Sequence, residues 1–341
     1  MNLSTTITTM ASLSTTTTMA PLSTTLDPLI HNMSCEVPHD DQSKVYTYHL
    51  SASFVASSTF IAILNFVMAI PCAFTNLLVI FAIIKNEHLQ ITPYKLLFSI
   101  CLADLITGAV AQPIFGTHIL QISAADHQCP LSNFMIYIVP VLILVTMVTH
   151  AVSALERYCS IHYVKNYEKI FSSRFVAGIL LLVWSISSIC FVVPFISGKT
   201  IVGGRIVIAL ILVSLAICSY CYISMYQDFK QQFVRTTAKI QGAYIIREEH
   251  PVERTADEQQ KFQKNIKIAS FFNKLYLCMF VIYLLTIVKN ILVAYDVTVD
   301  NATYTLSFVF DTILFSNAFI NPFLIFKFND EIYACVKDIF S

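Results

Sequence analysis

The chain has 341 residues, of which 56% are hydrophobic and 12% are charged, with a mean hydropathy of +0.68 and a formal net charge of zero. Soluble domains carry about 25% charged residues, so the composition excludes a soluble domain and predicts an all-α membrane protein with several spans. The balanced charge and the lack of a basic, aromatic-interleaved stripe exclude a nucleic acid partner. Glycine-rich phosphate loops, HExxH and paired CxxC motifs do not occur, so neither an enzyme nor a structural metal site is predicted.

The first 50 residues differ in composition from the rest of the chain. Residues 1–33 are rich in Ser and Thr and lack the apolar core of a cleavable signal peptide. Such a composition cannot bury a hydrophobic core. We therefore expect residues 1–50 to form a disordered extracellular segment.

Seven apolar windows follow, and each has the roughly 20 residues that a helix needs to span a bilayer. They cover residues 54–84, 94–120, 130–160, 174–197, 203–228, 266–295 and 303–327. The sequence thus predicts a seven-transmembrane helix bundle over residues 51–327. Residues 229–265, between the fifth and sixth windows, are expected to form a solvated inner loop.

Residues 328–341 carry a helical apolar pattern. Apolar side chains recur at three- and four-residue steps at Phe328, Ile332, Cys335, Val336, Ile339 and Phe340. This spacing predicts a short amphipathic eighth helix on the inner membrane face, followed by the cytoplasmic tail. Cys335 could carry a palmitoyl group or be a plain buried thiol.

Two independent signals orient the bundle. With residue 1 outside, 17 of the 21 Lys and Arg residues fall on the cytoplasmic side, which agrees with the positive-inside rule. The three N-glycosylation sequons begin at Asn2, Asn32 and Asn301, and all three fall on the outer side. We expect a multi-pass glycoprotein of the plasma membrane with an extracellular N-terminus.

A charged stretch ends the third window. Residues 134–155 contain no Asp, Glu, Lys or Arg, and Glu156, Arg157 and Tyr158 follow directly. Charges at the foot of a membrane-length helix are costly and therefore usually functional. Polar residues that could act with them occur in other windows. These are Asn76, Asp104, Thr146, His150, Trp184, Asn317 and Asn321, the last followed by Pro322, which is expected to kink its helix.

In order and spacing these residues resemble the landmarks of the rhodopsin-like (class A) G-protein-coupled receptors. Asn76 is similar to the first-helix asparagine, Asp104 to the Leu-Ala-x-Asp aspartate, Glu156-Arg157-Tyr158 to the (D/E)RY motif, Trp184 to the fourth-helix tryptophan, and Asn321-Pro322 to the start of NPxxY. The short second outer loop and the missing fifth-helix proline are similar to the melanocortin/adenosine receptor branch.

The resemblance implies a receptor without catalytic activity, whose partners are an extracellular ligand, a heterotrimeric G protein and the lipid bilayer. Glu156 would restrain Arg157 at rest, and Arg157 would meet the G protein when the sixth helix moves outward. The resemblance also implies a polar core that holds a sodium ion as its one possible cofactor. That core would consist of Asp104 as the charged ligand with Asn76, Thr146, Asn317 and Asn321. A protonated Asp104 bonded to Asn76 and Asn321 without sodium is the alternative.

Several features of the family are missing. The sixth helix has no CWxP motif, and Ile325 replaces the NPxxY tyrosine. The usual disulfide to the second outer loop is impossible, because residues 196–206 contain no cysteine. Cys35 and Cys129 could pair with each other instead, or remain two free thiols. His150 is expected to be a neutral histidine bonded within the bundle rather than a pH sensor.

Candidate ligand-binding residues lie in the outer half of the bundle. They are Gln112, Phe115, His118, Tyr137, Lys289, Asn290 and Asp311, a mostly apolar lining with a few polar points. Asp311 and Lys289 could anchor a charged ligand or could pair with each other.

The sequence thus favours a cell-surface receptor that transduces the binding of a small-molecule or peptide ligand to a G protein. A membrane transporter or channel subunit is one alternative, although the internal repeat typical of transporters is not found. A receptor-like protein that no longer signals is the other, because the sixth-helix motif is missing.

Overall fold

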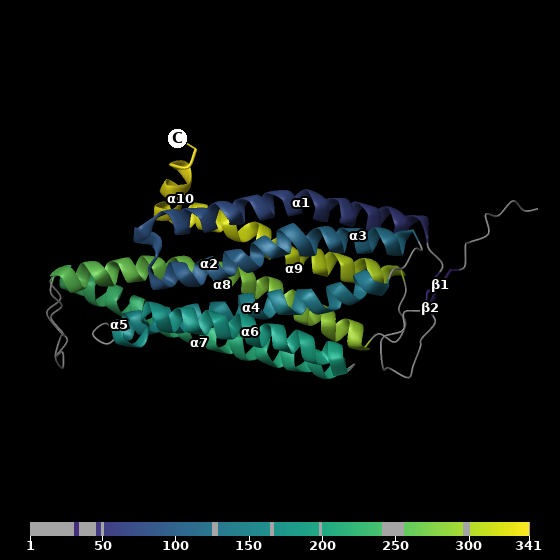
Figure 1. Ribbon diagram of the computed structural model, residues 1–341. Coiled ribbons are helices and arrows are strands. Elements are labelled where there is room, and N and C mark those ends of the chain that lie inside the picture. Colours follow the sequence, from purple (N-terminus) through teal and green to yellow (C-terminus); the bar gives the residue numbers. More distant parts are fainter. Residues whose placement is uncertain are drawn as a thin grey trace, which may run out of the picture.

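The computed structural model describes residues 31–33, 46–48, 51–124, 129–163, 167–197, 200–240, 256–295 and 301–340. Long helices that run side by side make up most of the molecule (Figure 1). They are α1 (Ala52–Lys85), α4 (Cys129–His162), α6 (Ser173–Ser197), α7 (Thr200–Ile240), α8 (Ala256–Tyr295) and α9 (Asn301–Phe328). A further long segment consists of α2 (Thr92–Ile106), the π-helix η2 (Thr107–Ala111) and α3 (Gln112–Ser123), which follow one another without a break.

These seven segments confirm the predicted seven-helix bundle. Within the described residues, six of them are long and apolar enough to cross a membrane. The seventh, α6, has 25 residues, and Ser173–Ile189 is its described apolar part. Large apolar side chains cover the outside of the bundle; Ile70 on α1 is 74% exposed and Leu181 on α6 is 71% exposed. Such a surface suits lipid rather than water, as in a multi-pass membrane protein.

Short elements lie at the ends of the bundle. η1 (Glu87–Leu89), α5 (Tyr167–Ile170) and α10 (Asp330–Lys337) lie where α4 ends, at what we call the Arg157 end (Figure 1). α10 is the predicted amphipathic helix, and its buried face consists of Ile332, Cys335 and Val336. At the opposite end β1 (His31–Met33) pairs antiparallel with β2 (Tyr46–Tyr48).

Two segments differ from their predicted form. The loop predicted over residues 229–265 is partly helical, because α7 continues to Ile240 and α8 begins at Ala256. Good helix formers such as Lys, Gln and Ala extend both helices beyond the apolar windows, and hydropathy does not register this extension. The β1–β2 pairing has no counterpart in the prediction for residues 1–50, most of which lie outside the described residues.

Two glycines allow α1 to pack closely on the second span. A Cβ at Gly108 in η2 would lie 2.8 Å from the backbone nitrogen of Ala73 and 2.8 Å from Sγ of Cys72. A Cβ at Gly116 in α3 would lie 3.0 Å from the ring of Phe66. Small residues at such contacts let helix backbones approach each other in a membrane.

Side-chain hydrogen bonds also connect the helices. Nε1 of Trp184 on α6 donates to Oγ of Ser99 on α2 at 3.1 Å. The hydroxyl of Tyr276 on α8 donates to the backbone carbonyl of Leu215 on α7 at 3.2 Å. These bonds fix α6 to α2 and the middle of α8 to α7.

We predict that Gly108→Ala lowers the free energy of unfolding by about 1–3 kcal/mol, because the added methyl group would overlap the backbone of α1. The thermal midpoint of the detergent-solubilised protein measures the effect. Gly178→Ala on α6 is the matched control, since a Cβ there meets no atom within 4 Å. Equal losses in the two variants would contradict close packing at Gly108.

Candidate functional site

Arg157 is buried near the end of α4. Its side chain and that of Glu156 are almost fully enclosed, with exposed fractions of 1% and 0% for the two residues. Nε and Nη2 of Arg157 donate to the two carboxylate oxygens of Glu156. A two-bond pair of this kind fixes the plane of the guanidinium. Arg157 is therefore held by its neighbour on the same helix, which is the arrangement expected of a restrained switch.

Tyr167 on α5 completes this charge pair. Its hydroxyl donates to Glu156, and Nη2 of Arg157 donates to the same hydroxyl at 3.4 Å. Burial, and then the neighbouring Glu156 charge, raises the pKa of Tyr167, so the phenol stays protonated and can donate. The sequence reasoning missed Tyr167, whose signal is a tyrosine ten residues after the arginine.

Tyr158, the third residue of the motif, takes no part in the pair. Its ring stacks on that of His162, with centroids 4.0 Å apart. Nε2 of His162 lies 2.7 Å from Oδ2 of Asp228 on α7. Tyr158 therefore belongs to the contact between α4 and α7.

A cavity of about 450 Å³ lies beside Arg157. Its polar lining comprises Gln90, Thr92, Arg157, Tyr167, Ser172, Ser173, Lys264 and Asn265. These residues come from α2, α4, α5, α6 and α8, except for Gln90, which directly follows η1, and Ser172, which directly precedes α6. The Arg157 end therefore has a recess large enough to admit several side chains of a partner.

The predicted polar core is assembled in the middle of the bundle. Asp104 on α2 is buried, and Nδ2 of Asn321 on α9 donates to its Oδ2 at 2.8 Å. Nδ2 of Asn76 donates at 3.0 Å to the backbone carbonyl of Ala318, and not to Asp104. The core therefore connects α1 and α2 with α9, the helix that contains Pro322.

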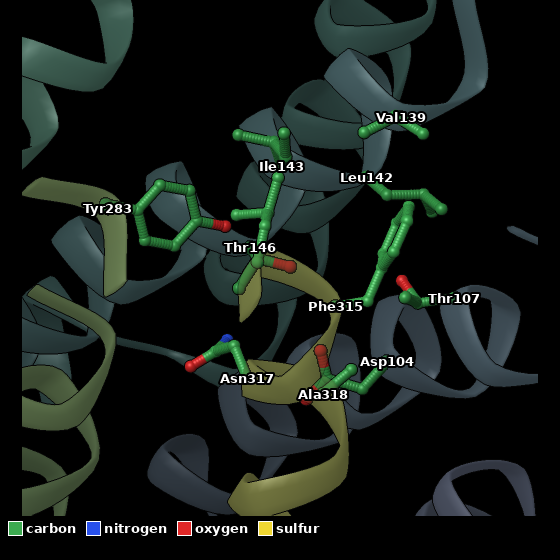
Figure 2. Close-up of a pocket in the computed structure, with 11 residues that line it drawn as sticks. Asp104, Thr107, Val139, Leu142, Ile143, Thr146, Tyr283, Phe315, Asn317 and Ala318 are labelled. Atoms are coloured by element: carbon green, nitrogen blue, oxygen red, sulfur yellow. The ribbon is translucent and has the colours of Figure 1, made fainter. Parts of the chain in front are cut away.

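A small cavity of about 20 Å³ adjoins Asp104. Figure 2 shows Asp104, Thr146, Asn317 and Tyr283 around it, with Phe315 on one side. A water molecule needs a cavity of roughly 10–15 Å³ on this measure, so one species of that size fits.

The donor atoms at this cavity suit a hard cation. Asp104 offers a carboxylate and Thr146 a hydroxyl. Oδ1 of Asn317 is buried and has no hydrogen-bond partner among the described residues. Such oxygen ligands fit a sodium ion. Clusters of three or more His, Cys, Asp or Glu, which would hold a transition metal, are absent from the part of the chain that the structure describes.

His150 lies between Thr146 and Arg157 along α4. It is completely buried, and neither ring nitrogen has a hydrogen-bond partner within the described residues. The hydroxyl of Tyr222 on α7 and Nη1 of Arg157 are likewise buried without such a partner. The expected bond from His150 within the bundle is therefore not present in the described part of the chain.

The predicted ligand pocket is described in part. Gln112, the first residue of α3, is fully buried, and neither polar atom of its amide has a partner among the described residues. Phe115 packs edge-on against Phe308 and Phe315, at centroid distances of 6.2 and 5.2 Å. Phe115 is therefore a core residue between α3 and α9.

The other pocket candidates are less fully described. His118 and Asp311 both have interaction partners. The side chains of Tyr137, Lys289 and Asn290 lie outside the described residues, so the pairing of Asp311 with Lys289 stays a prediction.

The predicted modification sites are distributed as follows. Sγ of Cys335 is buried, 3.6 Å from Nε2 of His88, which favours the reading as a buried thiol. Asn301 begins α9, at the end opposite Arg157, and Asn32 lies in β1. Asn2, Cys35 and the side chain of Cys129 lie outside the described residues. Glycosylation at all three sequons and the disulfide stay predictions.

We predict that Asn321→Ala lowers the free energy of unfolding by about 1.5–3 kcal/mol, because the buried Asp104 carboxyl loses its bond to Nδ2. The thermal midpoint of Asn321→Ala, Asp104→Ala and the double variant gives a double-mutant cycle. Groups in direct contact should couple by about 0.5–3 kcal/mol. Additive losses would show that this bond does not contribute.

Comparison with known proteins agrees with this arrangement. Residues 75–205, which include Asn76, Asp104, Arg157 and Trp184, match the family model described as 7 transmembrane receptor (rhodopsin family). The chain is 24% identical to Melatonin receptor type 1C of Xenopus laevis over 216 residues, which are 54% of this chain and 50% of that receptor. The chain thus spans about half the length of this curated relative. Over residues 75–205 the chain is therefore similar to the rhodopsin family of seven-transmembrane receptors, and its seven-helix bundle agrees with that similarity.

Proposed function

We propose that the protein is a cell-surface receptor that transduces the binding of an extracellular ligand to a heterotrimeric G protein. The observation that carries this proposal is the buried Arg157, which Glu156 and Tyr167 hold beside a cavity of about 450 Å³. A buried ion pair is weak evidence for stability. A charge kept next to a recess is better explained as a group that meets a partner when the recess opens.

The mechanism is a two-state equilibrium of the bundle. In the closed state Arg157 is paired with Glu156. In the open state α8 has moved away from α4, the cavity is wider, and Arg157 can contact the G protein. A ligand that binds the open state more tightly shifts the equilibrium toward it, and the G protein does the same from the other end.

The orientation in the plasma membrane follows from charge. Most Lys and Arg residues of the described helices lie toward the Arg157 end, and the sequon at Asn301 lies at the opposite end. Under the positive-inside rule the Arg157 end is cytoplasmic. The N-terminus is then extracellular, and the cavity beside Arg157 opens toward the G protein.

The extracellular half supports a small ligand that forms hydrogen bonds. Gln112 offers a buried amide whose oxygen and nitrogen have no partner among the described residues, and aromatic rings lie close by at Phe115. Because the curated relative is named a melatonin receptor, melatonin is the first probe, with peptides and other small molecules to follow.

We also propose that a sodium ion binds in this polar core, with Asp104, Thr146, Asn317 and Asn321 as its ligands. The donor oxygens and the cavity of about 20 Å³ support this proposal. The ion would supply the positive charge that a buried carboxylate needs. It would thereby stabilise the closed packing of α2 against α9.

We predict that Arg157→Ala abolishes G-protein activation while surface expression stays intact, because the partner loses its charged contact in the cavity. Guanine nucleotide exchange by a purified G protein, with the receptor in lipid nanodiscs, measures the effect. Arg174→Ala, an exposed arginine at the same end, is the matched control and should exchange normally.

Three outcomes would overturn the assignment. If the Arg157→Ala variant supports normal guanine nucleotide exchange, Arg157 is not the residue that contacts the G protein. A wild-type protein that never supports exchange, with any probe or G-protein subtype, would be a receptor-like protein that does not signal. Substrate-driven flux in cells without G proteins would indicate a transporter.

We predict that exchanging sodium for potassium at constant ionic strength lowers the thermal midpoint of the wild type and not that of Asp104→Asn. At a concentration 100 times the dissociation constant, a bound ion stabilises the folded state by about 2.7 kcal/mol. Equal midpoints of the wild type in the two salts would favour the protonated Asp104 instead.

A further inference from the structure

α8 is the helix whose movement would widen the cavity, and it lacks the usual means of bending. It is one continuous helix of 40 residues and contains neither proline nor glycine. Sharp kinks arise at prolines, at Gly/Ser pairs or at π-bulges. Any movement of α8 is therefore expected to be that of one rod, so a contact near its Arg157 end can affect the position of the whole helix.

Two lysines of α8 contact the junction of α9 and α10. Nζ of Lys264 lies 3.2 Å from Oε1 of Glu331 on α10. Nζ of Lys274 lies 4.0 Å from the ring centroid of Phe328, the last residue of α9. A cation at this distance from a ring is attracted by its π-electrons. We call Lys264, Lys274, Glu331 and Phe328 the lysine clasp.

Glu331 is held in place independently of Lys264. Its Oε2 accepts a hydrogen bond from the hydroxyl of Tyr94 on α2 at 2.9 Å. That hydroxyl accepts one from Nδ2 of Asn329 at 3.2 Å, and Oδ1 of Asn329 caps α10 at the backbone nitrogen of Ile332. Ordering both side chains is a large part of what weakens exposed ion pairs. Here one partner is already ordered.

Arg157 does not hold α8 in this way. Its carboxylate partner, Glu156, lies on its own helix, and the chain has no acidic residue between Glu258 and Asp296. Arg157 and Lys264 line the same cavity, so the nearby charge on α8 has the same sign as Arg157. Apolar packing of Ile268 and Phe272, and a bond of 3.3 Å from Nδ2 of Asn265 to the carbonyl of Ser160, hold α8 against the bundle at this end. Among the described residues, the clasp adds the attraction between opposite charges that Arg157 does not supply.

We propose that the lysine clasp sets the resting position of α8 and that opening of the Arg157 end separates Lys264 and Lys274 from Glu331 and Phe328. The effect on signalling, though not the movement itself, rests on the proposed function. Lys264 and Glu331 are thus positioning residues, which act on Arg157 through the placement of α8.

The movement is tested on the full chain in nanodiscs with spin labels attached through p-acetylphenylalanine at positions 263 and 333. Gln263 on α8 and Tyr333 on α10 are both exposed. Double electron–electron resonance then gives the distance between the two helices. Lys264→Glu and Glu331→Lys should each broaden the distribution toward longer distances. The charge-swapped double variant should restore the wild-type distribution, which also shows that these side chains are compatible with the fold.

Two controls isolate the contacts of the clasp. Lys267→Glu changes an exposed charge on the same helix and should leave the distances unchanged. Phe328→Leu should lengthen them, and Phe328→Trp, which keeps an aromatic face for Lys274, should not. Unchanged distances in both single charge reversals, or a double variant no closer to wild type than the singles, would overturn the proposal.

Basal nucleotide exchange on the same samples separates the two proposals. Each single reversal should raise it about two- to fivefold, the range by which an exposed ion pair can shift a two-state equilibrium. Longer distances without any exchange would keep the clasp and reject the receptor function. If Arg157→Ala abolishes nucleotide exchange but the clasp variants leave both exchange and distances unchanged, the receptor function is kept and the clasp is rejected.

Discussion

A guanidinium enclosed in an apolar bundle has to be neutralised, and the Arg157 end is arranged around that requirement. Glu156 supplies the charge and Tyr167 the additional hydrogen bond, so Nε and Nη2 of the guanidinium find their partners on α4 and the short α5. Since neither partner comes from α8, the movement proposed for α8 would not break this buried pair. Separating buried charges is expensive, whereas separating half-exposed ones is not. The strong electrostatic attraction, between Arg157 and Glu156, thus stays within α4. Only the weak attraction between Lys264 and Glu331 joins α8 to α10 and would be lost in the proposed movement.

α8 also borders both of the cavities described above, the small one beside Asp104 and the large one beside Arg157. Tyr283 borders the small cavity beside Asp104, and Lys264 borders the large one beside Arg157. At 1.5 Å per residue these positions are about 28 Å apart along the helix. Coupling between distant sites needs a physical element with two arrangements that both sites can bias. A helix without proline or glycine that borders both sites could serve as that element without the usual sixth-helix motif, provided that it takes the second position proposed above.

The sequence was sufficient to predict those parts of the structure that depend on the hydrophobicity of neighbouring residues in a single helix. Seven spans follow from hydropathy, and Asp104, Asn321 and Trp184 stand out because polar groups are rare there. Other features depend on contacts between segments far apart in the chain. Lys264 and Glu331 meet only once α8 and α10 are packed, and Tyr167 lies on α5, which is too short to leave a periodic pattern in the sequence. The inner loop was predicted too long, because hydropathy reports where a helix leaves the membrane and not where it ends.

The π-helix η2 affects how the second membrane span of this chain aligns with that of a relative. A wider turn at Thr107–Ala111 accommodates one residue more than an α-helix of the same length. Every side chain after it is therefore rotated by about 100° relative to an uninterrupted helix. Compared with a relative whose second helix is regular, this chain is in register up to Asp104 and one residue out of register from Gln112 onward. Transfer of ligand contacts from such a relative to Gln112, Phe115 or His118 therefore requires a one-residue gap at η2.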